Sequence, residues 1–400
     1  MDYKLSNFEI VNKTVFAKEE PPKTAVPLFI GYTEKTPEEK SAKIENFADY
    51  ERLFGREQYN GSSILYYSVK HFFDNGGKGG FVYSLGTHED LNAKDPQEIL
   101  TDLHDPTLIH YLDSEKTITL LAFPDVVLLP SNYSDMDFWS EAWERLLVLS
   151  LVRTNLFAVL DAPDDAGATV YCLESLTSYG ETGAAYWPFL KTQYTNETGT
   201  VTLPPSGAVL AAMQASDEQM GPWVSPANIK LSQVLKPTQG EYLLVSKWRP
   251  DLPHINIIKS FPGRGIYIWG ARTLAKNPHT LFQYINARRL LSYCEHELSA
   301  VVRPFVFEEN NELTWYQVKG LVYAWLFEFW QAGGLYGAEE EEAFQVSLGL
   351  DETMTQEDLH QGKMILRVAL ATLVPAEFIE LTLTLDMNGD GFISTEDGAE

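Results

Sequence analysis

The sequence predicts an α/β (α+β) fold with two domains, mixed sheets flanked by helices, and extended strand arms at both ends. Continuous apolar runs at 118–123 and 156–160 are typical of strands buried on both faces of a parallel sheet. The aromatic-rich stretch 138–152 between them is typical of a connecting helix. A proline pair near residue 21 and an alternating strand at 378–385 mark the two arms.

The composition and charge of the chain exclude several classes of function. The 400 residues suffice for one to three domains, and 44% apolar with 22% charged residues is ordinary for a globular protein. With 30 Lys+Arg against 56 Asp+Glu, the net charge of −26 repels phosphate backbones, so no nucleic-acid partner is expected. No run approaches the roughly 20 apolar residues of a membrane span, and the N-terminus has no signal-like core, which predicts cytoplasmic synthesis without direct membrane insertion.

Residues 1–26 are expected to form an N-terminal linking arm. Short strand-like pieces around Phe8, Ile10 and Val15 precede the linker Pro21–Pro22, where backbone is extended and cannot donate ladder hydrogen bonds. A strand without a sequence-adjacent partner is either disordered or completes a sheet elsewhere. Phe8, Ile10 and Val15 are therefore candidate intersubunit residues.

The first globular domain is expected at 27–253. It begins with a strand at 25–31 and helices at 47–54 and 63–73, and from residue 195 onward it reads as loops and short strands rather than long helices. The glycine-rich segment 75–80 follows a helix instead of preceding one, which predicts a helix end and not a phosphate cradle. Asp125 and Asp161, at strand ends, are either catalytic or turn-forming.

The second domain is expected at 254–376, with strands at 255–261 and 266–269 and a helix at 281–302. Its arginine cluster suits fixed carboxylate pairing, either in an internal salt-bridge network or on a partner surface. The cluster consists of Arg264, Arg272, Arg288 and Arg289, and the last three are the candidate partner contacts. Thr314 with Gln317 predicts a capped helix that ends at 333–334. Beyond it lie an acidic run at 339–342, a strand at 344–347 and a short helix begun by Thr355.

The C-terminal linking strand is expected at 377–385. Alternation places Ile379, Leu381 and Leu383 on one face and polar residues on the other. A half-buried strand near a chain end serves as an ordinary edge or is donated to a neighbour. We expect donation, with these three residues in intersubunit contacts.

The remaining segment, 386–400, contains the spacing of an EF-hand calcium loop. Oxygen donors stand at loop positions 1, 3, 5, 9 and 12, with the carbonyl of residue 392 at position 7 and glycine at position 6. Position 12 is aspartate where glutamate is usual, and no exit helix follows. The segment is either a Ca²⁺ site or an acidic tail; the candidate ligands are Asp386, Asn388, Asp390, Phe392, Ser394 and Asp397.

Several segments together resemble contractile tail sheath proteins of phage tails, R-type pyocins and extracellular contractile injection systems. The resemblance runs from about residue 26 to 385 and rests on segments that occur in the family's order: 72–77, 203–207, 223–228, 263–274 with 284–290, 305–315, and 375–379. It implies an outer α/β domain, an inner domain and two linking strands. The calcium-type loop is a departure from the family.

The resemblance also implies a function without catalysis: subunits in hexameric rings stack into a helical sheath around an inner tube and contract to drive the tube through a target envelope. The other implied partners are baseplate and terminal cap proteins, in a phage tail or tail-like particle that is released extracellularly. Candidate tube or partner contacts are Glu339, Glu340, Glu341, Glu342 and the three arginines. The alternatives are a calcium-dependent binding or adhesion module and an α/β hydrolase-type enzyme using Asp125 or Asp161.

Overall fold

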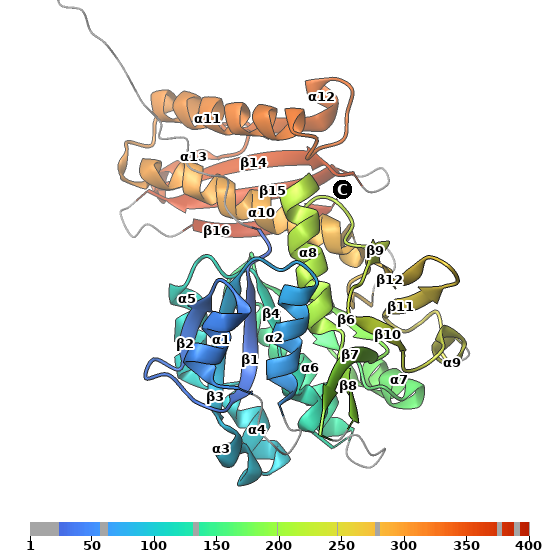
Figure 1. Ribbon diagram of the computed structural model, residues 1–400. Helices are drawn as coiled ribbons and strands as arrows, with labels where there is room; N and C mark the ends of the chain where they lie inside the picture. Colours follow the sequence, from blue (N-terminus) through green and yellow to red (C-terminus); the bar gives the residue numbers. More distant parts are fainter. Residues whose placement is uncertain are drawn as a thin grey trace, which may run out of the picture.

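The chain folds into two domains that are stacked end to end (Figure 1). The computed structural model describes residues 24–56, 63–130, 136–197, 199–245, 247–276, 281–373, 378–387 and 393–399. We call residues 24–284 the large domain and residues 285–399 the small domain, because each has its own sheet and its own core. Among the described residues, no helix has the length and apolarity that crossing a bilayer requires.

The large domain is built on a nine-stranded mixed sheet. Its central strands β1, β3, β4, β5 and β6 pair in parallel, whereas β2, β12 and β9 join antiparallel. In spatial order the strands are β2 (Ser41–Ile44), β3 (Gly80–Thr87), β1 (Pro27–Thr33), β4 (Leu120–Ala122), β5 (Phe157–Asp161), β6 (Gly183–Trp187), β11 (Asn256–Phe261), β12 (Gly265–Trp269) and β9 (Ile229–Lys230). A separate three-stranded sheet contains β10 (Val234–Pro237), β7 (Leu190–Asn196) and β8 (Gly199–Leu203).

Helices cover both faces of the nine-stranded sheet (Figure 1). One core cluster packs against α4 (Pro96–Asp102), α5 (Pro106–Ser114), α6 (Asp137–Leu149), α7 (Ala166–Ser175) and α9 (Glu241–Val245). The other packs against α1 (Phe47–Phe54), α2 (Ile64–Asp74) and α8 (Ser206–Met220). The predicted α/β class, with buried parallel strands flanked by helices, is confirmed.

The glycine-rich segment after α2 ends that helix, as predicted. Backbone N–H groups of Gly76 and Gly77 donate to the carbonyls of Phe73 and Phe72, and Gly76 has a φ of 94°. A Cβ at Gly77 would lie 2.4 Å from the Phe72 ring, so only glycine fits there. These N–H groups are bound to the helix and do not point at a ligand.

The expectation that residues 195–253 contain no long helix is wrong. The fifteen-residue helix α8 lies there, and its residues from Ser206 to Gln214 are all buried. A Cβ at Gly207 would lie 2.3 Å from the carbonyl oxygen of Ser68, so this glycine allows α8 and α2 to approach backbone to backbone. A helix that is buried on all sides has no amphipathic period by which the sequence reveals it.

The small domain consists of a four-stranded antiparallel sheet and two long helices. The sheet order is β13 (Phe344–Ser347), β14 (Lys363–Ala371), β15 (Phe378–Asp386) and β16 (Ile393–Ala399). The helices α10 (Ile285–Val302) and α11 (Glu312–Gln331) pack on it, with the short α12 (Glu340–Ala343) and α13 (Gln356–His360) beside them. The predicted strand at 344–347 and the short helix begun by Thr355 are confirmed, and Thr355 forms a capping box with Asp358.

The predicted domain boundary at 253/254 is wrong. Strands β11 and β12 belong to the large sheet, because β11 pairs with β6 over Asn256↔Tyr186 and Ile257↔Trp187. The boundary lies instead within the start of α10: Ile285 packs in the core of the large domain, and Leu290 packs in the core of the small domain. Helix α10 therefore connects the two cores.

The start of α11 also differs from the prediction. The N-cap is Asn311, whose side chain accepts a hydrogen bond from the Thr314 backbone N at 3.1 Å, so Thr314 lies inside the helix. Asparagine and threonine both satisfy free N–H groups at helix starts, and the sequence offers both within one turn.

The sequence predicts that strand 377–385 pairs with a neighbouring subunit rather than within its own chain. This prediction is wrong, because the strand pairs within its own chain. Strand β15 is a central strand of the small domain, paired with β14 from Ala371↔Phe378 to Lys363↔Asp386 and with β16 on its other side. The side chains of Leu381 and Leu383 are 0% exposed in the core of the same chain. The strand follows a short connection from β14, and this proximity favours pairing within the chain.

Candidate assembly surfaces

Asp125, on which the enzyme hypothesis depends, lies at the carboxyl end of the parallel strands and is 2% exposed. Its Oδ2 accepts a hydrogen bond from the Tyr32 backbone N at 2.7 Å, and its Oδ1 accepts one from the Leu65 N at 3.1 Å. Because Leu65 is in the first turn of α2, the carboxylate caps this helix and fixes it to β1. This geometry supports a structural role.

Asp161 has the same function at the start of α8. Its Oδ1 accepts a hydrogen bond from the Ser206 backbone N at 2.8 Å. Its carbonyl oxygen accepts the indole N–H groups of Trp139 and Trp143, at 3.1 and 2.9 Å. No group of three His, Cys, Asp or Glu side chains suited to a metal ion occurs among the described residues.

The burial of Asp161 predicts a pH dependence of stability. Burial raises the pKa of its carboxyl to about 7, against about 3.9 in an unfolded chain. Between about pH 4 and pH 7 the folded state therefore holds a proton that the unfolded state has lost, so this group makes the free energy of unfolding fall as pH rises. Asp161→Asn, which keeps an oxygen toward Ser206, should make that slope less negative by up to about 1.4 kcal/mol per pH unit. Urea unfolding at several pH values measures the slope, and an unchanged slope contradicts the prediction.

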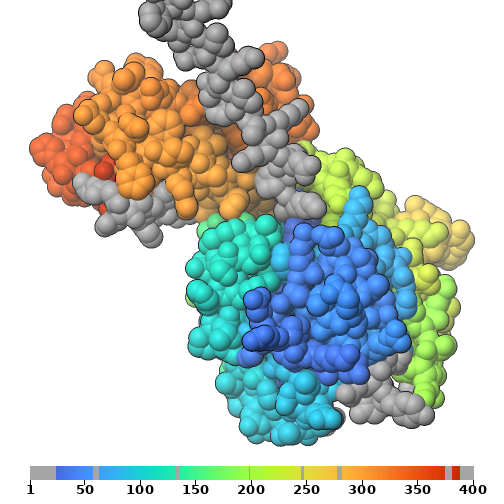
Figure 2. Space-filling model, turned by 60° about the vertical axis from the view of Figure 1, so that its left-hand side comes forward, coloured from blue at the N-terminus to red at the C-terminus, as the bar shows by residue number. Residues whose placement is uncertain are grey.

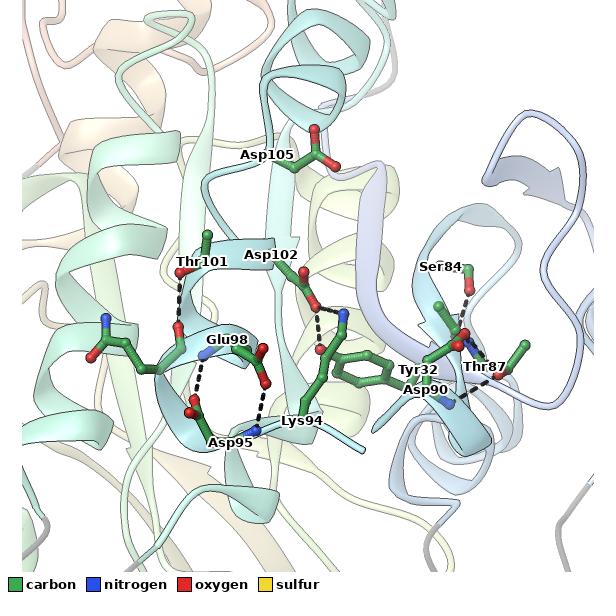
Figure 3. A network of polar contacts seen from close by, with 12 residues as sticks. Tyr32, Ser84, Thr87, Asp90, Lys94, Asp95, Glu98, Thr101, Asp102 and Asp105 are labelled. Carbon is green, nitrogen blue, oxygen red and sulfur yellow. Dashed lines mark hydrogen bonds and ion pairs between the residues drawn. The ribbon is translucent and has the colours of Figure 1, made fainter. Parts of the chain in front are cut away.

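A polar network covers the carboxyl ends of β1 and β3 (Figure 3). The Tyr32 hydroxyl donates to Asp102 Oδ2 at 2.5 Å, and the Lys94 ammonium pairs with the same carboxylate while lying 5.5 Å from the centre of the Tyr32 ring. Asp95 and Glu98 form a capping box at the start of α4. These groups bind one another and link β1 to the helices α3 (His88–Asn92) and α4.

Arg289 forms an internal ion pair, which is one of the two outcomes that the sequence left open for the arginine cluster. Its Nη1 donates to Asp217 Oδ1 at 3.0 Å, and its Nη2 donates to the Thr24 carbonyl at 2.9 Å. The Arg289 and Asp217 side chains are 6% and 4% exposed. Arg289 therefore joins α10 to α8 and to the segment that precedes β1. The sequence gives no signal for Asp217, because 72 residues separate the two.

Arg272 and Arg288 are partly exposed and stacked on aromatic rings. The Arg272 guanidinium lies 4.9 Å from the Tyr284 ring and donates to Gln283 Oε1 at 3.0 Å. The Arg288 guanidinium lies 5.1 Å from the Phe282 ring. The three candidate contacts of the cluster thus divide into one buried ion pair and two stacked side chains.

A groove of about 960 Å³ separates the two domains beside the Arg289 ion pair. Figure 2 shows the small domain and the large domain as distinct masses. Lys78 and Lys116 line the groove from the large domain, and Tyr293 and His296 line it from α10. Burial lowers the pKa of His296.

The acidic run lies on the surface of the small domain. Glu339, Glu341 and Glu342 are exposed, and Glu340 is partly exposed in α12. None of the ion pairs found between described residues includes any of these four glutamates. The contact of this exposed run with a partner stays a prediction.

The calcium-type loop only partly matches EF-hand geometry. Asp386 ends β15 and Ser394 lies in β16, so the two strands bring positions 1 and 9 to one end of the hairpin. Asp397 pairs with Leu381, five residues along β15 from Asp386, which is about 17 Å at the rise of a strand. At this position β16 continues as a strand, whereas an EF-hand begins a helix there. Asn388, Asp390 and Phe392 lie outside the described residues.

The structure describes only some of the candidate intersubunit residues. Phe8, Ile10 and Val15 lie outside the described residues, and of Ile379 the structure describes only the backbone in β15. Strand β16 is an edge of the four-stranded sheet and pairs only with β15 among the described strands. Its other edge is a surface to which a further strand can add.

Comparisons with known proteins agree with a structural role. No family model matches the chain. A chain of the anti-feeding prophage (AFP) baseplate in the contracted state is 36% identical, with a TM-score of 0.82 over 94% of this chain and 97% of that chain. A chain of the PVC sheath complex, from an extracellular contractile injection system in the contracted state, is 26% identical, with a TM-score of 0.69 over 94% and 95%.

The AFP helical sheath in the contracted state contains a chain that is 29% identical, with a TM-score of 0.67 over 90% of this chain and 92% of that one. The tail sheath protein of Vibrio phage KVP40 is 28% identical over 136 residues, which are 34% of this chain and 20% of the phage protein. The chain thus matches about one fifth of the length of that curated relative.

The two-domain fold, the capped strand ends and these matches define a structural subunit of a contractile apparatus. The chain belongs to the family of contractile tail sheath proteins.

Proposed function

We propose that this protein polymerises as hexameric rings stacked into a helical sheath around an inner tube, and that contraction of the sheath drives the tube through a target envelope. Baseplate and terminal cap proteins bind the two ends. The observation that carries the proposal is the match at 36% identity, over nearly the full length of both chains, to a chain of the contracted AFP baseplate. Synthesis is cytoplasmic, followed by assembly into a phage tail or tail-like particle that is released.

Electron microscopy of the purified protein, with and without its inner tube protein, tests this proposal. Ordered tubes of stacked rings are the expected result. Monomers alone, across a range of concentrations and with the tube protein present, would contradict it.

Strand exchange is the proposed link between subunits. The proposal includes one exchanged strand, whereas the sequence predicts an exchanged strand at each end of the chain. Because β15 is paired on both sides within its own chain, the exchanged strand is assigned to the N-terminal residues around Phe8, Ile10 and Val15. The acceptor is the outer edge of β16 in the next subunit. Backbone hydrogen bonds of this kind keep subunits connected while domains rotate as rigid bodies.

The inner tube is the proposed partner of the exposed glutamates 339–342. Contacts between charged groups are weakened by salt. Such contacts can hold a tube firmly enough to template assembly and loosely enough to release it. Changing all four to glutamine should weaken cosedimentation with the cognate tube protein and reduce the salt dependence of binding. The matched control changes four exposed glutamates of the large domain to glutamine: Glu38, Glu39, Glu89 and Glu197. Equal tube binding by both variants across a salt titration would remove the acidic run from the tube contact.

Calcium is the proposed ligand of the turn between β15 and β16. The ligands are Asp386, Asn388, Asp390, the carbonyl of Phe392 and Ser394, without Asp397. Asp386→Ala with Asp390→Ala should abolish calcium binding in titration calorimetry, whereas Asp397→Ala should leave it unchanged. No binding heat with the parent protein, and no effect of a chelator on its thermal stability, would identify the segment as an acidic tail only.

A further inference from the structure

One face of the large domain combines basic and aromatic side chains, close to the sheet edge formed by β9. We call it the cationic face; its residues are Lys230, Lys259, Phe261, Arg264, Tyr267 and Trp269. The strand register aligns Lys259 with Tyr267 and Tyr267 with Lys230, which places these three side chains in one row across β11, β12 and β9. The neighbouring residues Ile258, Ile266 and Ile268 point to the other side of the sheet and are buried.

Aromatic rings hold two of the basic groups of this face, those of Arg264 and Lys259, in place. The Arg264 guanidinium lies 5.7 Å from the Phe261 ring and 5.5 Å from the Tyr267 ring, and the Lys259 ammonium lies 5.5 Å from the Phe261 ring. The Phe261 ring packs edge-on against Tyr267 and Trp269, with centroids 5.7 and 5.1 Å apart. Basic groups that are fixed in this way lose little conformational freedom when a partner binds.

Two charges of the cationic face are not neutralised by any carboxylate in the described part of the chain. Lys259 pairs with Glu241, whereas Lys230 and Arg264 form no ion pair with any described carboxylate. Both are exposed, and Trp269 is 49% exposed beside them. An exposed tryptophan and arginine beside a partly exposed tyrosine form the composition that dominates binding energy in protein interfaces. In a chain with 56 acidic and 30 basic residues, unpaired basic groups point to an acidic partner.

A second copy of this chain carries a matching surface around α12, where Glu339, Glu341 and Glu342 are exposed. The 43 residues between Lys319 and Lys363 contain no lysine or arginine and nine carboxylates: Glu328, Glu339, Glu340, Glu341, Glu342, Asp351, Glu352, Glu357 and Asp358. All of this segment belongs to the small domain. Figure 1 separates α12, which carries the acidic run, from β11 and β12 in the large domain, so the two surfaces lie apart within one molecule.

We infer that the cationic face of one subunit binds the acidic surface around α12 on the next subunit. This inference rests on the proposed function, since it specifies a contact by which the sheath polymerises. Two different surfaces that complement each other form a head-to-tail contact, and such contacts generate rings or open helices instead of closed dimers. Because the chain carries a net charge of −26, subunits repel one another, and this contact between opposite charges offsets part of that repulsion.

A charge-exchange experiment without any tube protein tests the inference. The first variant carries Lys230→Glu and Arg264→Glu, and the second carries Glu339→Lys and Glu341→Lys. Either variant alone should polymerise with a critical concentration raised at least about tenfold, because like charges then meet at the contact. An equimolar mixture should recover polymerisation, since each reversed surface finds its reversed complement. Turbidity and electron microscopy report tube formation, and thermal unfolding checks that both variants are folded.

The matched control is Lys35→Glu with Arg56→Glu, which makes the same charge change at two exposed positions in the large domain, away from this face. Its critical concentration should stay within about twofold of the parent's. Parental polymerisation by the first variant would overturn the inference, as would a mixture no better than its components. Failure of the parent to form tubes under any condition would instead count against the proposed function. Because no tube protein is present, a tube contact of the same glutamates does not affect the result.

Discussion

Replacing Arg289 by alanine should lower the free energy of unfolding by about 3–5 kcal/mol, because it leaves the buried Asp217 carboxylate without its counter-ion. Asp217 also accepts a hydrogen bond from the Thr24 hydroxyl at 2.5 Å, but a hydroxyl does not neutralise the charge. The Thr24 carbonyl loses its donor from Arg289 Nη2 at the same time. The effect is large because three segments that are distant in sequence meet at this one pair.

Urea unfolding monitored by tryptophan fluorescence measures the loss. The matched control is Arg288→Ala at the adjacent position, where a partly exposed guanidinium stacks on Phe282; it should cost less than about 1 kcal/mol. The double replacement Arg289→Met with Asp217→Leu should recover most of the stability, since no buried charge remains. Equal stability of the Arg289 and Arg288 variants would show that the ion pair is not what joins the domains.

The sequence allowed the central sheet to be predicted because local signals agree there. Apolar strands such as β4 and β5 are short, continuous and bounded by turns, and α6 between them has a clear apolar face. Helix α8 was missed because burial on every side removes its period, and because proline and glycine at its start resemble a loop. What makes Gly207 necessary is a contact with Ser68, which sequence spacing does not reveal.

Long-range pairing explains the other differences. The register of β11 with β6 decides that the β11–β12 hairpin belongs to the large domain, and 70 positions separate the paired residues Asn256 and Tyr186. The sequence likewise identified the arginine cluster but not which member is buried, because Asp217 comes from another helix. The alternation of β15 was correctly recognised, whereas its partners were not, since a strand pattern does not specify what lies beside it.

Deleting residues 2–18 should block the formation of ordered tubes while leaving a folded, soluble monomer. The described core begins at Ala25 and Val26, so the deletion removes none of the buried residues of either domain. The melting temperature should therefore stay close to that of the parent. Assembly should fail because the outer edge of β16 then receives no strand from a neighbour, and edge hydrogen bonds are the proposed link between subunits.

A variant of unchanged length shows whether the deletion blocks tubes because a strand is lost or because the chain is shorter. The replacements Phe8→Ser, Ile10→Ser and Val15→Ser remove apolar side chains that a strand buries when it joins a sheet, and they should block tubes as the deletion does. The control Asn7→Ser with Asn12→Ser changes two polar positions of the same segment and should assemble normally. Electron microscopy at equal protein concentration compares all four proteins. Regular contractile tubes from the deletion variant would show that subunits are held together without the N-terminal strand, and that surface contacts between whole domains suffice for the sheath.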